Sequence, residues 1–189
     1  MSRIGKKEIV IPQGVQAEVQ GQTVNIKGPK GELVLQVHQD IAVELKDQHI
    51  VLAPKSQEYV AKPVRALWGT MRQLIFNMVQ GVMQGYEKKL EIEGVGFKAA
   101  VEGDLLALTI GFTEPVKLKI PQGVKVLVEK SVIAVSGPEK EKVGQFAASV
   151  RKAKPVEPYK GKGIKYQGEF VRRKLGKRAA ATTGTGAAK

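Results

Sequence analysis

The sequence contains no cysteine, which excludes disulfide bonds and thiolate chemistry. No stretch approaches the roughly 20 apolar residues that a membrane-spanning helix requires. The apolar run near the N-terminus covers only residues 9–11, too few for a signal peptide. These absences predict a soluble, cytoplasmic protein with no membrane partner.

Motifs of the common enzyme classes are also missing. The chain has no GxGxxG, Walker A or GxSxG motif and no suggestive arrangement of Ser, His and Asp. His38 and Asp40 precede Asp47 and His49 in a spacing that could gather a metal, which leaves a metal-dependent enzyme as one alternative. Polar ends of two strands facing water are the favoured interpretation. We therefore predict no enzyme activity, cofactor, metal site or small-molecule substrate.

Acidic residues are scarce in one region of the chain. Between Arg151 and Arg178, eleven Lys and Arg residues accompany only Glu157 and Glu169. Residues 1–150, by contrast, hold nineteen basic and sixteen acidic residues, although the whole chain carries a formal charge of +13. A balanced body with a strongly basic C-terminal region indicates a polyanionic partner.

Short apolar stretches rich in β-branched residues divide the chain into two halves. The first half contains EIVIP, TVNIKG, ELVLQV, IAVEL and HIVLAP; the second contains KLEIEGVGFKAAVEG, LLALTIGF, VKLKIP, VKVLVEK and SVIAVSG. Their partial alternation predicts strands. An amphipathic helix is predicted after each set, over 59–80 and over 140–153. We expect an α+β fold of two tandem similar domains, each a small, mostly antiparallel sheet packed against one helix.

Two internal alignments support a duplication. A shift of 109 matches IPQGV at 11–15 with IPQGV at 120–124, and gives eight identities over nineteen positions. A shift of 82 matches 14–26 with 96–108, with fewer identities, but only this shift keeps strands and helices in the same order. We favour it, so the repeated IPQGV is interpreted as a recurrent turn.

The composition changes again near Pro155. Prolines at 155 and 158 end the second helix and impose an extended path. The sequence predicts four segments: a first domain over 1–82, a second over 83–154, a basic extension over 155–178 and a low-complexity tail over 179–189. The tail is expected to be disordered.

The segment YKGKGIKY at 159–166 combines lysines, glycines and tyrosines. Ammonium groups suit phosphate, glycine lets backbone N–H groups approach it closely, and tyrosine stacks on unpaired bases. A solvated basic tail is the alternative. The predicted nucleic-acid-binding residues are Lys152, Lys154, Tyr159, Lys160, Gly161, Lys162, Gly163, Lys165, Tyr166, Arg172, Arg173, Lys174, Lys177 and Arg178. The acidic pair Glu91 and Glu93 is expected to be solvated.

These residues resemble a known family. PVEPYKGKGIKY at 155–166, the segment 65–99 and the opening MSRIGKKEIVIP are similar to the bacterial family of large ribosomal subunit protein six. The resemblance covers about residues 1–178, although Val156 stands where the family often has proline. It implies two tandem α+β domains, a structural role in the large ribosomal subunit, and binding of large-subunit ribosomal RNA.

The resemblance also implies a location near the sarcin–ricin loop and the stalk base, beside neighbouring large-subunit proteins. Binding is expected chiefly through the second domain and its extension. Removing residues 154–189 is therefore expected to leave a folded body without specific RNA affinity. The alternative is a free-standing general RNA-binding or RNA-chaperone module, which would bind many RNAs with little selectivity.

Overall fold

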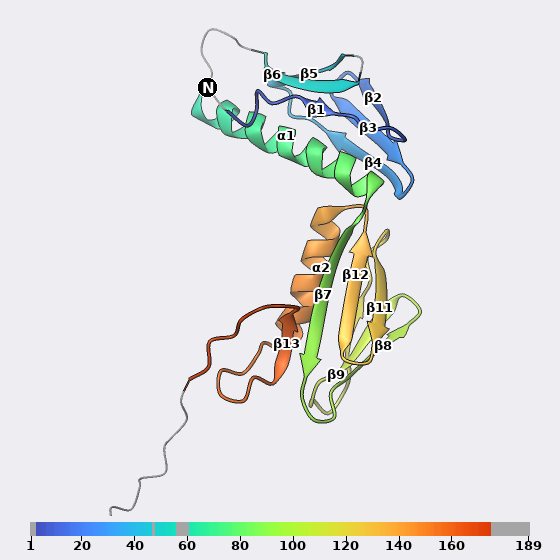
Figure 1. Ribbon diagram of the computed structural model, residues 1–189, viewed down its shortest axis with the longest axis vertical. Coiled ribbons are helices and arrows are strands. Elements are labelled where there is room, and N and C mark those ends of the chain that lie inside the picture. Colours follow the sequence, from blue (N-terminus) through green and yellow to red (C-terminus); the bar gives the residue numbers. More distant parts are fainter. Residues whose placement is uncertain (1–2, 47, 56–60, 175–189) are drawn as a thin grey trace, which may run out of the picture.

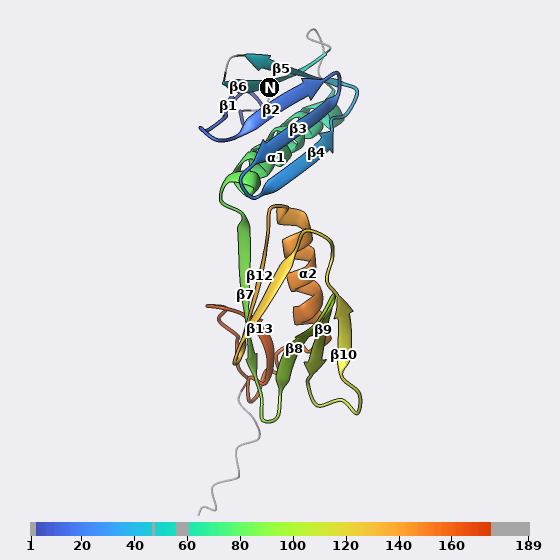
Figure 2. The ribbon, with the colours of Figure 1, turned by 90° about the vertical axis from the view of Figure 1, so that its right-hand side faces the viewer.

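The computed structural model describes residues 3–46, 48–55 and 61–174, which form two α+β units along one long axis (Figure 1, Figure 2). The elements of the first unit are β1 (Ile9–Val10), β2 (Gln16–Gln20), β3 (Thr23–Gly28), β4 (Gly31–Gln36), β5 (Ile41–Lys46), β6 (His49–Pro54) and α1 (Lys62–Met83). Those of the second are β7 (Tyr86–Glu93), β8 (Lys98–Glu102), β9 (Leu105–Thr109), β10 (Val116–Lys119), β11 (Lys125–Glu129), β12 (Val132–Gly137), α2 (Lys140–Ala153) and β13 (Gly163–Tyr166).

Both units have the same strand topology. In the first unit, one sheet has the order β1-β6-β5 and the other the order β2-β3-β4. In the second unit, β7-β12-β11 and β8-β9-β10 repeat these orders, and β13 adds a fourth strand beside β7. The predicted fold of two similar α+β domains, each with antiparallel strands and one helix, is confirmed. Each unit contains two small sheets where the sequence indicated one.

The spacing of equivalent elements distinguishes the two internal alignments. Strand β2 at 16–20 and strand β8 at 98–102 lie 82 positions apart. The two IPQGV segments occupy different places in the units: the first joins β1 to β2, and the second joins β10 to β11. In both, the valine N–H donates to the proline carbonyl at 3.2 Å, and the glycine has a positive φ of 89° or 83°. IPQGV is thus a recurrent turn, as predicted.

Each helix covers its sheets with one apolar face. Helix α1 begins at Lys62, with Pro63 in its first turn, and residues 59–60 of the predicted helix lie outside the described residues. The core of the first unit comprises Ile9, Val15, Val24, Ile26, Val37, Ile41, Ile50, Leu52, Trp68, Ile75, Val79 and Val82. The core of the second comprises Leu90, Ile92, Leu106, Leu108, Ile110, Val124, Val126, Ile133, Val135, Val143, Phe146, Ala147, Val150 and Ile164.

Strands β2 and β13 were not predicted from the sequence, and one predicted strand is divided into two. Strand β2, QAEVQ, has few apolar residues and is mostly exposed or half-buried. The predicted strand over 89–103 is interrupted at Gly94 to Phe97, where the Phe97 N–H donates to the Gly94 carbonyl at 3.3 Å. The turn separates β7 from β8.

The basic segment differs most from its prediction. Residues 163–166 form β13, which pairs antiparallel with β7, and Ile164 is fully buried in the second core. The sequence signal was weak because a single isoleucine stands among glycines and lysines. Removing residues 154–189 would therefore remove part of the core, so the expectation that an intact body remains is corrected.

The two units meet where α1 ends. Within the first unit, the Lys30 N–H donates to the Val82 carbonyl at 2.9 Å and fixes the end of α1. Gly85, with a φ of 77°, then turns the chain into β7 of the second unit. Gly81 packs directly against the carbonyl oxygen of Pro138, a contact that leaves no space for a Cβ atom. Close backbone contact therefore holds the end of α1 against the start of α2.

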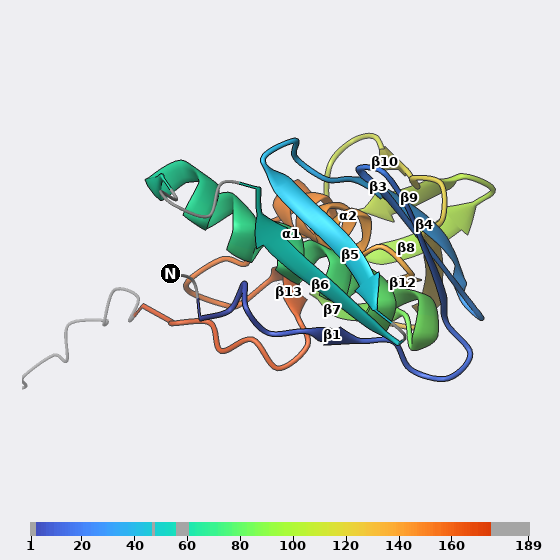
Figure 3. The same ribbon diagram turned by 90° about the horizontal axis from the view of Figure 1, so that it is seen from above.

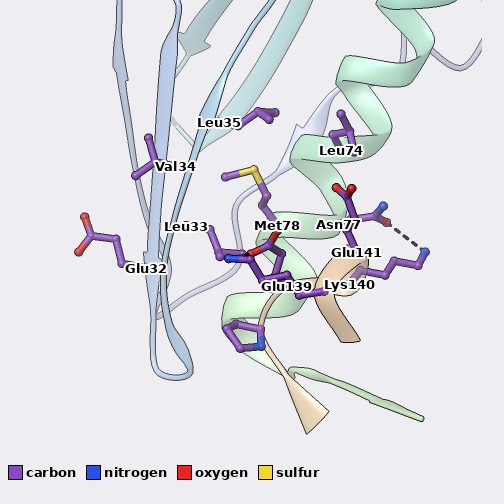
Figure 4. A pocket seen from close by; sticks show the side chains of 12 residues that line it. Glu32, Leu33, Val34, Leu35, Leu74, Asn77, Met78, Glu139, Lys140 and Glu141 are labelled. Carbon is purple, nitrogen blue, oxygen red and sulfur yellow. Dashed lines mark hydrogen bonds and ion pairs between the residues drawn. The ribbon is translucent and has the colours of Figure 1, made fainter. Parts of the chain in front are cut away.

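A groove of about 600 Å³ runs beside this junction (Figure 4). One wall is apolar, formed by residues 33–35 of β4 with Leu74 and Met78 of α1, and the other is formed by residues 138–142. The Lys140 ammonium lies 3.4 Å from the Asn77 side-chain oxygen across it. Acidic and basic side chains are mixed here, so the groove lacks the uniform positive charge of a phosphate site.

Candidate nucleic-acid interface

The basic segment lies along one side of the second unit, next to β13 (Figure 1). It begins in the last turn of α2, passes through the loop 154–162 and continues beyond β13 to residue 174. The exposed cations of this segment are Lys152, Lys160, Lys162, Arg172, Arg173 and Lys174. Lys177 and Arg178 lie outside the described residues. We call these six exposed cations, with Tyr159, the extension surface.

The glycines of the motif shape the loop itself. The Gly161 N–H donates to the Glu157 carbonyl at 3.1 Å, so the expectation that this amide approaches phosphate is corrected. Gly161 has a φ of 77°, and a Cβ atom there would lie 3.0 Å from the Arg173 guanidinium. Gly163, with a φ of 141°, would place a Cβ atom 2.7 Å from the Pro155 carbonyl oxygen. Both glycines allow close packing of protein against protein.

This tight loop projects polar side chains outward. The Glu157 N–H donates to the Lys162 carbonyl at 2.8 Å, which closes the loop. Tyr159 at its tip is 54% exposed, and Lys160 and Lys162 beside it are exposed. An exposed aromatic ring in a loop that also carries ammonium groups can stack on a base while the ammonium groups contact phosphates.

Lys165 has a different environment from the other lysines of the motif. Its ammonium lies 2.6 Å from a carboxylate oxygen of Glu93 and 3.5 Å from one of Glu91, both on β7. The hydrogen bond to Glu93, assisted by Glu91, raises the pKa of Lys165 above its ordinary value. The two glutamates were expected to be solvated, but both pair with Lys165. These ion pairs fasten β13 to the sheet.

A second polar cluster fixes the chain after β13. The Glu169 carboxylate accepts a hydrogen bond from Arg151 Nε at 3.1 Å and another from the Tyr166 N–H at 3.1 Å. These bonds, the one from Arg151 first, hold the pKa of Glu169 below its ordinary value. The Arg151 guanidinium also lies 5.7 Å from the centre of the Tyr166 ring. The cluster connects α2, β13 and the following residues.

Sequence reasoning did not identify Arg151 or Glu169 as positioning residues, because their contact depends on the path of the chain around β13. It also passed over Phe170, which is 92% exposed beside the basic side chains. Lys154 lies half-buried, with its ammonium 4.7 Å from the centre of the Phe112 ring. Five of the predicted residues thus contact mainly protein: Lys154, Gly161, Gly163, Lys165 and Tyr166. The extension surface remains as the part that faces outward.

Two other features of the sequence can now be placed. His38 lies between β4 and β5 with its Nδ1 atom 3.4 Å from an Asp40 oxygen, while His49 begins β6. Asp47 lies outside the described residues. Within the described part of the chain, no three His, Cys, Asp or Glu side chains gather in a metal-binding arrangement. Neither described helix is long and apolar enough to cross a membrane.

Comparison with known proteins gives one consistent result. The family described as Ribosomal protein L6 matches the chain twice, over residues 11–85 and 93–167. The "Large ribosomal subunit protein uL6" of Bradyrhizobium sp. (strain BTAi1 / ATCC BAA-1182) is 49% identical over 179 residues, which cover 94% of this chain and 99% of that protein. Proteins of the same name from Methylorubrum extorquens (strain PA1) and Beijerinckia indica subsp. indica are 48% and 47% identical, with the same coverage. The two matched ranges follow the 82-residue repeat of the fold.

Proposed function

The chain belongs to the ribosomal protein L6 family, and on that premise we propose that it is a structural component of the large ribosomal subunit that binds large-subunit ribosomal RNA. Its relatives are named as large ribosomal subunit proteins, and they match this chain over almost their whole length. The observation that carries the proposal is the extension surface, whose six exposed cations belong to the segment that lies along one side of the second unit.

The proposed mechanism is non-catalytic and depends on a fixed presentation of charge. The ion pairs of Lys165 hold the segment within β13, and the Arg151–Glu169 contact holds it just after that strand. Because the chain is already ordered, little conformational entropy is lost when its cations meet phosphates. Phosphate contacts position the protein, and the distinctive shape of a folded RNA supplies the selectivity.

The proposed location is near the sarcin–ricin loop and the stalk base, where translation factors dock. Neighbouring large-subunit proteins would complete this environment. The support for the location is the resemblance of the motif at 155–166 to the family. In-cell UV cross-linking, with sequencing of the RNA joined to this protein, tests it. We expect reads confined to one region of large-subunit ribosomal RNA, with cross-linked peptides from 155–174; reads scattered over many transcripts would favour the general RNA-binding alternative.

A matched pair of variants tests the extension surface without cutting the chain. The extension variant combines Lys160→Ala, Lys162→Ala and Arg172→Ala, all at exposed positions. The control variant removes the same charge from β8, β10 and β11, strands that do not pair with β13, by changing three exposed lysines: Lys98→Ala, Lys119→Ala and Lys125→Ala.

Affinity for deproteinised large-subunit ribosomal RNA should fall in the extension variant by about tenfold to one hundredfold at 0.1 M salt, since each lost phosphate contact removes a counterion-release contribution. The control variant should bind nearly as tightly as the parent protein. If the two variants lose affinity equally, only net charge matters and the proposed surface is wrong.

A further inference from the structure

The first unit also carries exposed cations close together, at the opposite end of the chain. Arg3, Lys6 and Lys7 lie in a turn before β1, and all three side chains are exposed. Within the described residues, none of them forms an ion pair with a carboxylate. We call residues 3–7 the N-terminal turn. Charge balance over the whole first unit conceals this local excess.

The N-terminal turn is fixed against α1. Its own Lys7 N–H donates to the Ile4 carbonyl at 3.1 Å. Gly5 lies against the ring of Trp68, where a Cβ atom would approach a ring carbon to 2.6 Å, and Trp68 itself donates to the Leu52 carbonyl at 2.8 Å. Glycine at position 5 and the buried indole therefore set the path of the turn.

The helix beneath the turn adds to its positive charge. The Arg72 guanidinium donates to the carbonyls of Lys7 and Glu8, at 3.2 and 3.4 Å, and remains partly exposed. Helix α1 contains Lys62, Arg65 and Arg72 but no acidic residue along its 22 positions. Arg72 thus holds the turn in place and contributes charge at the same point.

The N-terminal turn can bind the same partner as the second unit because of where it lies. Seen along the side of the molecule, the N-terminal turn and the segment around β13 lie on the same side (Figure 1). The view along the long axis places them on that side as well (Figure 3). One extended RNA surface could therefore contact both units at once.

We propose that the N-terminal turn, with Arg72, is a second site for the phosphate backbone of the ribosomal RNA that binds the extension surface. The site takes phosphodiester groups of structured RNA, without base readout, because residues 3–7 and Arg72 supply cations and include no aromatic side chain. This inference rests on the proposed function and adds the first unit to the binding surface. Two separated contacts would fix the orientation of the elongated protein on its RNA, which a single contact cannot do.

The test uses the full chain with three exposed side chains changed: Arg3→Ala, Lys6→Ala and Lys7→Ala. Thermal unfolding should be unaltered, since Gly5 still lies against the Trp68 ring and the Arg72 guanidinium still donates to the backbone carbonyls of residues 7 and 8. Binding to deproteinised large-subunit ribosomal RNA is measured from 0.05 to 0.5 M salt, beside the extension and control variants. We expect an affinity about tenfold to one hundredfold lower at 0.1 M salt and a log–log salt slope smaller by about two units.

The outcomes separate this inference from the proposed function. If the turn variant matches the control variant while the extension variant loses affinity, the second site is wrong and the proposed function stands. If neither loses affinity, both are wrong. A photo-reactive amino acid at position 6 provides a second measurement in assembled subunits: cross-links to large-subunit RNA support the site, and cross-links only to protein would mean that the turn faces an acidic protein neighbour and overturn it.

Discussion

The two units share one topology but differ at the strand edge beside their first strand. In the first unit, β1 has two paired residues, and Pro12 follows almost immediately. In the second, the equivalent strand β7 has eight residues, and its edge away from β12 pairs with β13. The pairing runs from Gly163 opposite Glu93 to Tyr166 opposite Leu90. An uncovered edge exposes unpaired N–H and C=O groups, and β13 satisfies them.

This difference indicates how a duplicated unit acquires separate roles. Each unit keeps its sheets and helix, and the added chain at each terminus carries the exposed cations of one proposed RNA site. At the N-terminus this added chain lies on the helix, held by Trp68 and Arg72. At the C-terminus it joins the sheet, held by Ile164 and by the pairing of Lys165. Both additions depend on the fold beneath them for a fixed position.

The largest expected effect comes from removing the apolar contact of β13. Ile164→Ala should lower the free energy of unfolding by about 2–5 kcal/mol, because the side chain is fully buried and a cavity would remain. Leu127→Ala on β11 is the control, since Leu127 is 63% exposed, and should change stability by less than about 0.5 kcal/mol. Urea unfolding measures both. Equal effects would mean that β13 is an accessory strand outside the core.

The helices allow the next comparison, because each contains a glycine in a different setting. Gly81 of α1 has no space for a Cβ atom beside Pro138, whereas Gly144 of α2 has no atom within 4 Å of that position. Gly81→Ala should destabilise the protein by about 1–3 kcal/mol through overpacking. Gly144→Ala should stabilise it by about 0.5–1 kcal/mol, because alanine has the higher helix propensity.

Calorimetric unfolding of these two variants gives the sign as well as the size of each effect. Opposite signs would confirm that the junction between the units is closely packed. If both substitutions stabilise the protein, the units do not rest on each other at Gly81.

The smallest expected effect is a pH dependence of the chain after β13. The pKa of Glu169 is lower in the folded protein than its ordinary value of about 4.3, so its stabilising contribution is present above that value. It is lost as the pH falls through the folded pKa. For a partly exposed pair, screened by solvent, the loss should stay below about 1 kcal/mol. Hydrogen exchange of the Tyr166 amide should accelerate relative to other β13 amides on acidification below about pH 4, and Glu169→Gln should remove this change.

The sequence alone determined the general architecture, because alternation in strands and the spacing of apolar residues in helices follow from local geometry. Residues 140–153 form α2 with the predicted bounds, and the shift of 82 identified the repeat correctly. It also located the excess of positive charge after Arg151, since charge is a sum over residues and needs no coordinates.

Tertiary structure decided which of those charges face outward. Lys160 and Lys165 look alike in the sequence, but only Lys165 meets Glu91 and Glu93, about seventy residues earlier in the chain. The same holds for the glycines, whose amides and close contacts depend on the path around Pro155 and Arg173. A pattern of neighbours along the chain cannot encode these partners, because ion pairs and close backbone contacts form between segments that only the packed fold brings together.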